Sequence, residues 1–246
     1  MNYRPILITL GIAALMACDA CSRFPGVHRA DPAIVPPSDV VDFNALYKQN
    51  CAGCHGVDGK GGAAIALSNP LFLAIADDTV IRRVASNGVP GTPMSAFAQS
   101  AGGMLPEKQI DALVSGIRSW AKPNVLGGQT PPPYKAPAPG DAQRGAGAYR
   151  TYCSSCHGAD GRGGSKAGSI VNGSYLALVS DQQLRTIVIA GRPELGSPDW
   201  RADVEGQSMS AQDVSDVVAW LSSQRSKFPG QPYPISPMDA AQGGSQ

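Results

Sequence analysis

The 246-residue sequence has little charge, few aromatic residues and no long apolar run. Charged residues make up 16% of the chain and the formal net charge is +1, which argues against a nucleic-acid-binding or other polyanion-binding protein. Aromatic residues make up 6%, whereas 29 glycines and 21 prolines are present, so we expect small lobes with many turns and modest cores. Lobes of that size commonly need a metal or cofactor to remain folded.

The longest apolar stretch, residues 6–17, is too short to cross a membrane, which takes about 20 residues. Its length is typical of the apolar core of an export signal. The stretch ends in Leu15-Met16-Ala17-Cys18, which resembles the bacterial lipobox. We therefore predict a signal peptide at residues 1–17 and lipidation of Cys18. Two alternatives remain open, namely cleavage after Ala20 to give a soluble periplasmic protein, or an uncleaved anchor. Cys21 has no assigned partner under any of them.

Residues 47–62 recur 102 positions later as residues 149–164. Both copies contain the pattern Tyr-x3-Cys-x2-Cys-His-Gly-x-Asp-Gly-x-Gly-Gly. The repeat continues, because residues 78–88 align with residues 181–191 and each copy closes with an amphipathic helical pattern at 107–120 or 211–223. The chain is therefore built from two copies of one unit.

Helical spacing dominates both copies, and the alternation expected of strands is missing. Asp42 or Asp141 is placed to cap a first helix that runs into the cysteine pair, and Asp78 or Asp181 to cap a middle helix. The last helices carry apolar stripes at Ile110, Leu113, Val114 and Ile117, and at Val214, Val217, Val218 and Leu221. We predict an all-α fold with two small domains, residues 41–122 and 140–228, joined by a Pro-rich, semi-rigid linker at 123–139. Residues 18–40 are expected to form an anchor and tether, and residues 229–246 a disordered tail.

The spacing Cys-x-x-Cys-His carries its own chemistry. Two thiols three residues apart at the end of a helix can each add to one vinyl group of a haem, and the adjacent histidine then binds the iron. Zinc ribbons place their cysteine pairs about 15–20 residues apart, whereas 98 residues separate Cys54 from Cys153. A thioredoxin-like dithiol needs a βαβ setting, and disulfides leave the histidines unexplained. We therefore predict two haem c groups, attached at Cys51, Cys54, Cys153 and Cys156 with His55 and His157 as iron ligands.

These motifs resemble those of bacterial class I cytochromes c in tandem dihaem form, over about residues 41–122 and 140–228. The resemblance implies haem between crossed helices, a contact of Tyr47 and Tyr149 between first and last helices, and a methionine from a later loop as the sixth ligand. Residues 91–97, Gly-Thr-Pro-Met-Ser-Ala-Phe, resemble the family's ligand loop. Met94, 39 residues after His55, is therefore the predicted sixth ligand of haem 1.

The second copy departs from this pattern, because aligning Gly88 with Gly191 puts Ser197 where Met94 falls. Three alternatives remain open for haem 2. Met209, 52 residues after His157, can supply the ligand although it aligns with Leu105, a packing position. The iron can also be five-coordinate or hold water, or a side chain can come from elsewhere, with Lys166, His28 and Met238 as candidates. We predict Met209. Arg82 and Arg185, at equivalent positions, are placed either to meet haem propionates or to lie on a solvated helix face.

The resemblance implies an electron carrier rather than an enzyme. We expect it on the periplasmic side of the cytoplasmic membrane, held by an N-terminal lipid, with lobes that swing on their tethers. The expected donor is a quinol-oxidising complex or other donor and the acceptor a terminal oxidase. One alternative is a dihaem peroxidase or sulfur-compound oxidase with an open second haem, for which a proton-transferring partner is missing. Another is a haem subunit bound permanently to an oxidase or dehydrogenase.

Overall fold

The computed structural model describes residues 35–201, 204 and 206–227. The predicted signal peptide, the lipobox with Cys18, the candidate ligands His28 and Met238, and the predicted tail lie outside these residues. Pro37–Asp39 form a short 3-10 helix, η2, in a unit separate from the one that begins at Val40. No helix in the described part of the chain is long and apolar enough to cross a membrane.

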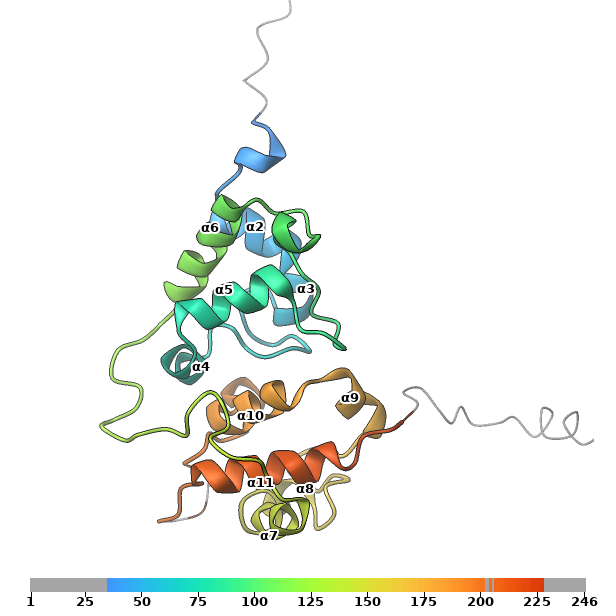
Figure 1. Ribbon diagram of the computed structural model, residues 1–246. Helices are drawn as coiled ribbons and strands as arrows, with labels where there is room; N and C mark the ends of the chain where they lie inside the picture. Colours follow the sequence, from blue (N-terminus) through green and yellow to red (C-terminus); the bar gives the residue numbers. More distant parts are fainter. Residues whose placement is uncertain (1–34, 202–203, 205, 228–246) are drawn as a thin grey trace, which may run out of the picture. The chain divides into compact units, whose positions relative to one another are not determined.

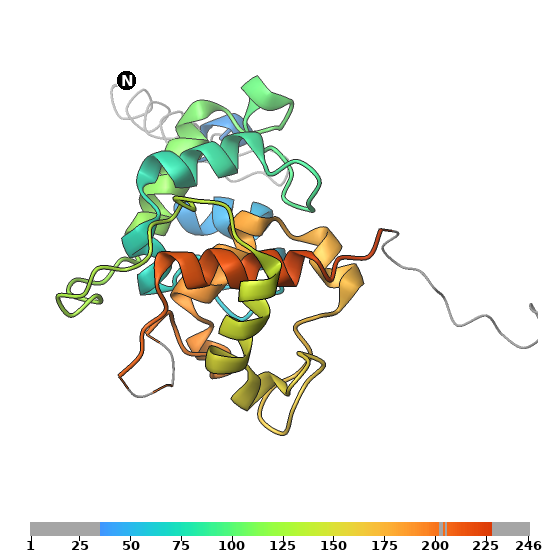
Figure 2. The same ribbon diagram turned by 60° about the horizontal axis from the view of Figure 1, so that its bottom comes forward.

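The unit from Val40 onward contains two helical halves with the same order of elements (Figures 1 and 2). The first half contains α2 (Phe43–Asn50), α3 (Ala52–His55), α4 (Pro70–Ile75), α5 (Asp78–Asn87), η3 (Gln99–Ala101) and α6 (Glu107–Arg118). The second half contains α7 (Ala142–Tyr152), α8 (Ser154–His157), α9 (Gly173–Leu178), α10 (Asp181–Ala190), η4 (Pro193–Leu195) and α11 (Ala211–Ser222). No β-strand occurs in the described residues, and the predicted all-α fold is confirmed.

Side-chain caps begin the first and middle helices of each half, and one of the two predicted pairs of caps is wrong by one residue. Asp42 accepts the Ala45 N–H at 2.7 Å and Asp141 accepts the Arg144 N–H at 2.8 Å, as predicted. The middle helices α5 and α10 are capped by Asp77 and Ser180 instead. Asp78 and Asp181 are the first residues of α5 and α10. Their negative charges stabilise the positive ends of the helix dipoles, and they form ion pairs with Arg118 and Arg225.

The first helix of each half packs across the last, α2 on α6 and α7 on α11. Tyr47 meets Trp120 edge-on with ring centroids 5.1 Å apart, and Tyr149 stacks on Trp220 at 4.3 Å. The predicted apolar stripes of α6 and α11 are buried in the two cores. The aromatic pairs and the stripes together fix how the helices that end in the Cys-x-x-Cys-His motifs lie over the cores.

An arginine fastens the short helix of each half in the same way, from the last residue of α6 in the first half and from just beyond α11 in the second. Arg118 donates to the carbonyls of Leu73 and Ala76, both at 2.6 Å, and to Asp78 at 2.5 Å. In the second half Arg225 donates to the carbonyls of Leu176 and Val179, both at 2.9 Å, and pairs with Asp181 at 2.6 Å. These arginines satisfy the last carbonyls of α4 and α9, so both short helices are held by one repeated arrangement.

The Pro-rich linker is bound to the second half and is not a free tether. Arg185 is 2% exposed and donates to the carbonyl of Pro133 at 2.9 and 3.0 Å and to that of Tyr134 at 3.2 Å. The Tyr134 ring packs against the core of the first half. The two alternatives predicted for Arg185, a propionate contact or a solvated face, are therefore wrong, because its guanidinium holds linker carbonyls.

The two halves also contact each other directly, at a junction formed by α4 and α10. The Asn69 side chain is 6% exposed, and its Nδ2 donates to the carbonyls of Ala190 and Gly191 at 3.0 and 3.3 Å. Ala190 is part of the first core, and Ile75 packs against the second. Arg192 donates to the Gly62 carbonyl at 2.9 Å. These buried contacts oppose the free swinging that was expected of the halves.

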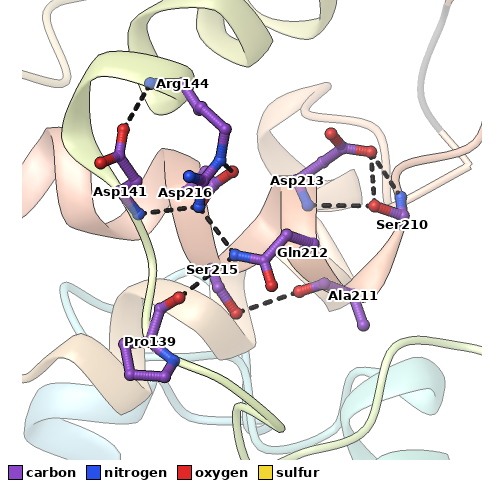
Figure 3. A network of polar contacts seen from close by, with 9 residues as sticks. All are labelled: Pro139, Asp141, Arg144, Ser210, Ala211, Gln212, Asp213, Ser215 and Asp216. Atoms are coloured by element: carbon purple, nitrogen blue, oxygen red, sulfur yellow. Dashed lines mark hydrogen bonds and ion pairs between the residues drawn. The ribbon is translucent and has the colours of Figure 1, made fainter.

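A network around Asp216 joins the linker, α7 and α11 (Figure 3). The carboxylate is nearly buried and accepts the Asp141 N–H at 2.7 Å, two Arg144 N–H groups at 2.8 and 2.9 Å, and the Gln212 amide at 2.8 Å. The hydrogen bond from Arg144 is the main reason that the pKa of Asp216 falls to about 2.

We expect Asp216→Asn to lower the free energy of unfolding of the haem-loaded protein by about 1–3 kcal/mol at pH 7, measured by denaturant titration. The pKa of Asp216 is lower in the folded state than the ordinary value near 3.9, so its contribution is present above about pH 4 and is lost as the pH falls toward 2. The difference between variant and wild type should narrow over that range. Asp111→Asn, in the exposed pair with Arg82, is the control and should cost about 0–1 kcal/mol. Equal losses in both variants would contradict the assignment.

Candidate haem-binding sites

The first Cys-x-x-Cys-His motif begins where α2 ends. The Cys51 N–H donates to the Tyr47 carbonyl at 2.8 Å, and the His55 N–H donates to the Cys51 carbonyl at 3.0 Å, so the motif turns through α3. Cys51 and Cys54 form no disulfide. Burial, with Cys54 adding to it, raises the pKa of Cys51 to about 11, which keeps this thiol protonated at neutral pH.

One ring nitrogen of His55 is already engaged, which leaves the other for a metal. Nδ1 lies 2.8 Å from the Ile65 carbonyl, and the side chain is 8% exposed. Burial lowers the pKa of His55, which favours the neutral imidazole that a metal ligand needs. A backbone carbonyl on Nδ1 fixes the ring orientation and the tautomer with Nε2 as the free donor atom.

The second motif repeats this geometry. His157 Nδ1 lies 2.8 Å from the Gly168 carbonyl, and Cys153 and Cys156 form no disulfide. Burial, with Cys156 adding to it, raises the pKa of Cys153 to about 11. No group of three or more His, Cys, Asp or Glu residues able to hold a metal ion occurs in the part of the chain that the structure describes. Paired free thiols beside an oriented histidine fit haem c at both sites.

The chain reverses directly after each histidine at a glycine with positive φ. Gly56 has φ 83° and Gly158 has φ 80°. A Cβ at Gly56 would lie 1.8 Å from the Lys60 carbonyl oxygen, so only glycine fits this turn. The Tyr47 hydroxyl donates to the Gly56 carbonyl at 2.9 Å, and Tyr149 donates to Gly158 likewise. These bonds tie the glycine-rich loops to the crossing of the helices.

The loop with Met94 is closed by its own backbone. The Val89 N–H donates to the Met94 carbonyl at 2.8 Å, and the Thr92 hydroxyl donates to the Val89 carbonyl at 2.8 Å and accepts the Met94 N–H at 3.2 Å. Met94 is half-buried. The loop therefore presents one defined position for the predicted thioether ligand.

The equivalent loop of the second half closes in the same way around a serine. Arg192 and Ser197 exchange both backbone hydrogen bonds, at 3.1 and 3.0 Å, which places Ser197 where Met94 lies in the first half. Met209 is 5% exposed in the core, and its N–H donates to the Trp200 carbonyl at 2.8 Å. Leu105 makes the matching bond to Phe97 at 2.8 Å. Ligation of haem 2 by Met209 stays a prediction.

Charged side chains near Ser197 are paired. Arg192 and Glu194 form an ion pair at 2.5 Å with both side chains mostly buried. Asp199 accepts two side-chain hydrogen bonds from Arg201, at 2.7 and 2.9 Å. Burial tends to raise the pKa of Asp199, but the hydrogen bonds from Arg201 outweigh it and hold that pKa below its ordinary value. Both carboxylates are thus engaged.

Three residues that shape these sites were missed by the sequence analysis. Ile65 and Gly168 orient the histidines through carbonyl oxygens, which any residue type can supply, so the sequence carries no signal for them. Arg192 pairs with Glu194 and donates to the Gly62 carbonyl of the first half, and in the sequence only its position beside Gly191 pointed to it.

Arg82 forms surface ion pairs with Asp111 and Glu107, and its side chain is 40% exposed. Of the two alternatives predicted for it, the structure therefore shows the solvated helix face.

A helical fold with two Cys-x-x-Cys-His sites defines a c-type cytochrome. The chain belongs to the family described as "Cytochrome C oxidase, cbb3-type, subunit III", whose model matches residues 39–115 and 140–221. Haem c is therefore its cofactor class, and electron transfer of the cytochrome c type is its activity.

Relatives occur in respiratory complexes. The "Cytochrome bc1 complex cytochrome c subunit" of Mycobacterium tuberculosis is 24% identical over 181 residues, which cover 72% of this chain and 60% of that protein. The subunit of the same name in Mycobacterium leprae is 25% identical over 151 residues, 59% of this chain and 50% of that protein. The chain thus spans at most 60% of the length of these two relatives. The c-type cytochrome KustC0563 superposes with a TM-score of 0.29 at 29% identity, over 33% of this chain and 99% of that one.

Carbon monoxide binding to the dithionite-reduced, haem-loaded protein distinguishes the two sixth-ligand loops. With Met94 and Met209 as the predicted sixth ligands, we expect little carbon monoxide binding in the wild type. Met94→Ala and Met209→Leu should each let about half of the haem bind carbon monoxide. Met104→Ala, a change of an 83% exposed methionine in the first half, is the control. A wild type in which about half of the haem binds, together with a Met209→Leu variant that binds no more, would show instead that Met209 does not bind the iron of haem 2.

Proposed function

We propose that the chain carries two haem c groups and transfers single electrons between a quinol-oxidising complex and a terminal oxidase. The duplicated site carries this proposal. In both halves a histidine directly follows two free cysteines, and its Nδ1 lies 2.8 Å from a backbone carbonyl. Cys51, Cys54, Cys153 and Cys156 attach the haems, His55 and His157 bind the irons, and Met94 completes the first site. Haem c supplies one-electron redox chemistry when bound, without group transfer.

The surroundings of Ser197 favour a carrier over a dihaem peroxidase or sulfur-compound oxidase. An enzyme with an open haem needs a group that gives and takes a proton close to the reacting atom. The carboxylates that flank Ser197 in the chain, Glu194 and Asp199, are each bound to an arginine. His55 and His157 are the two histidines in the described residues, and both belong to the attachment motifs.

A haem subunit held permanently in a respiratory complex is the second candidate. The observation that favours it is that both the matched family and the mycobacterial relatives are named as subunits of such complexes. The chemistry within the chain is the same in both cases, because only the lifetime of the contact with the donor or acceptor differs.

The electron-transfer proposal is tested with the full chain in its native membranes. We expect about two haems per chain by pyridine haemochrome analysis, reduction of both by added quinol, and reoxidation by oxygen through the oxidase. A Cys153→Ala/Cys156→Ala variant should retain about one haem and serves as a spectroscopic reference for the first half. Haems that quinol fails to reduce, or that oxygen fails to reoxidise, would contradict this role.

We further propose that Cys18 is lipidated and holds the chain on the periplasmic side of the cytoplasmic membrane. The support is the run Leu15-Met16-Ala17-Cys18 after a short apolar stretch. Cys18→Ser should block lipidation, because the hydroxyl does not replace the thiol, and should abolish the mass added by acyl chains in intact-protein mass spectrometry. Cys21→Ser is the matched control and should keep that mass. A wild-type protein without the added acyl mass would contradict the proposed lipidation.

A further inference from the structure

The two halves meet through unlike surfaces, the α4 surface of the first half and the end of α10 in the second. The α4-type surface of the second half therefore takes no part in the junction. The first half uses α4 and the preceding Asn69, whereas the second half uses the end of α10 with Gly191 and Arg192. Ile65, Ala66, Asn69 and Phe72 of the first half line one small pocket together with Thr186, Ile187, Ala190, Gly191 and Arg192 of the second half. A contact between unlike faces leaves each half with one face unused.

The second half possesses the counterpart of the α4 surface. Asn69 and Asn172 both cap the short helix that follows, since each side-chain oxygen accepts backbone N–H groups. Arg118 and Arg225 hold the ends of α4 and α9 through equivalent carbonyls. The register of these bonds makes Tyr175 the counterpart of Phe72 and Leu178 the counterpart of Ile75. We call Asn172, Tyr175 and Leu178 the α9 face.

The α9 face is apolar and exposed, although its counterpart is covered. Phe72 is 5% exposed at the junction, whereas Tyr175 is 40% and Leu178 46% exposed. Asn69 Nδ2 donates to two carbonyls of the second half, whereas Asn172 Nδ2 makes no hydrogen bond within the described residues. Along the chain the face follows closely on the second motif, because Gly168, whose carbonyl orients His157, is only a few residues ahead of Asn172.

We propose that the α9 face docks a c-type cytochrome domain of another protein, which presents the end of its middle helix and the following glycine. The junction shows what a surface of this kind binds, namely the carbonyls of Ala190 and Gly191 at the end of α10. This inference rests on the proposed electron-transfer function. Docking brings two c-type haems into one complex, so that one is oxidised as the other is reduced by a single electron and no bond is made or broken. The small size of the face suits a transient complex.

A second copy of this chain does not fit as the occupant. Its first half would have to present the end of α5 and Gly88, which has φ 66° like Gly191 at φ 67°. There, however, the exposed Arg83 stands where Thr186 is 2% exposed at the junction, and Val89 stands in place of Arg192. Burying an unpaired guanidinium against Tyr175 and losing the arginine donor would both oppose the contact.

Photo-crosslinking with the full, haem-loaded chain in native membranes identifies the occupant. Tyr175 or Leu178 is replaced by p-benzoylphenylalanine, and Met104, which is 83% exposed in the first half, is replaced in the same way as the control. We expect positions 175 and 178 to give an adduct that stains for covalent haem, with the crosslinked peptide at the end of a helix followed by glycine. An adduct with a chain lacking Cys-x-x-Cys-His, an adduct with a second copy, or no adduct from either position would overturn the proposal.

Asn172→Asp tests the same face without disturbing the helix, because the carboxylate still caps α9 while the donor is lost. We expect the rate at which membranes oxidise or reduce the haems to fall at least about fivefold, with no change in the rate of oxidation by ferricyanide. Leu178→Ser should lower these rates in the same way, and Met104→Ser should not. If the wild type exchanges no electrons with membranes, the proposed function itself fails. If wild type and Asn172→Asp react equally fast, only the docking proposal fails.

Discussion

The crossing of the first and last helices is the constraint on which each half depends. The helix that crosses also ends in Cys-x-x-Cys-His, so its position decides where the thiols and the histidine lie. Close approach is secured by glycine, but from opposite sides in the two halves. In the first half Gly116 of α6 lies under the Phe43 ring, where a Cβ would come within 2.0 Å, and in the second half Gly145 of α7 lies against the Asp216 carbonyl at the same spacing. The tyrosine–tryptophan pairs lie at this crossing, and in the first half the tryptophan also contacts the glycine-rich loop. A Cβ at Gly59 would lie 2.6 Å from the Trp120 ring, so the loop packs closely against it. A change at the crossing would therefore shift the histidine of the Cys-x-x-Cys-His motif.

The two halves share the contacts that hold their helices and motif histidines, and they differ at the middle arginines and at the loops of Met94 and Ser197. The arginine that holds the short helix and the carbonyl that orients the histidine recur in both halves. The middle arginines diverge, since Arg82 pairs with carboxylates at the surface and Arg185 is buried on the linker. The loops predicted to face the iron diverge too, since both close by the same backbone bond but one carries methionine and the other serine. The residues that hold the fold are therefore different from those that vary between the two sites, so the sites can differ while the fold stays the same.

Patterns within short stretches of the sequence predicted the features that short-range interactions determine. The attachment motifs, the caps Asp42 and Asp141, the apolar stripes and the all-α class follow from spacing along the chain, and the structure places these elements as expected. The middle caps were assigned one residue late because Asp77-Asp78 and Ser180-Asp181 each offer two adjacent capping side chains, and only the geometry selects one. Long-range contacts left no such pattern. Nothing in the sequence near Arg185 shows that its partners are carbonyls some fifty residues earlier in the chain. The position of Met209 was open for the same reason, since both a ligand and a core methionine are compatible with its spacing.

The junction changes how the halves are expected to work together. With free tethers, electron exchange between the halves would depend on how often they meet, and linker length would set that frequency. Here Asn69 satisfies two carbonyls at the end of α10 and an arginine of the second half holds the glycine-rich loop of the first. Separating the halves would expose Phe72 and Ile75 and break these bonds, so the contact is maintained by burial as well as by hydrogen bonding. The two halves of the unit that begins at Val40 are therefore held against each other, and a partner docked on the α9 face would meet both Cys-x-x-Cys-His motifs in a fixed arrangement. An unsymmetric junction also explains why a chain built from two alike halves keeps one face free for such a partner.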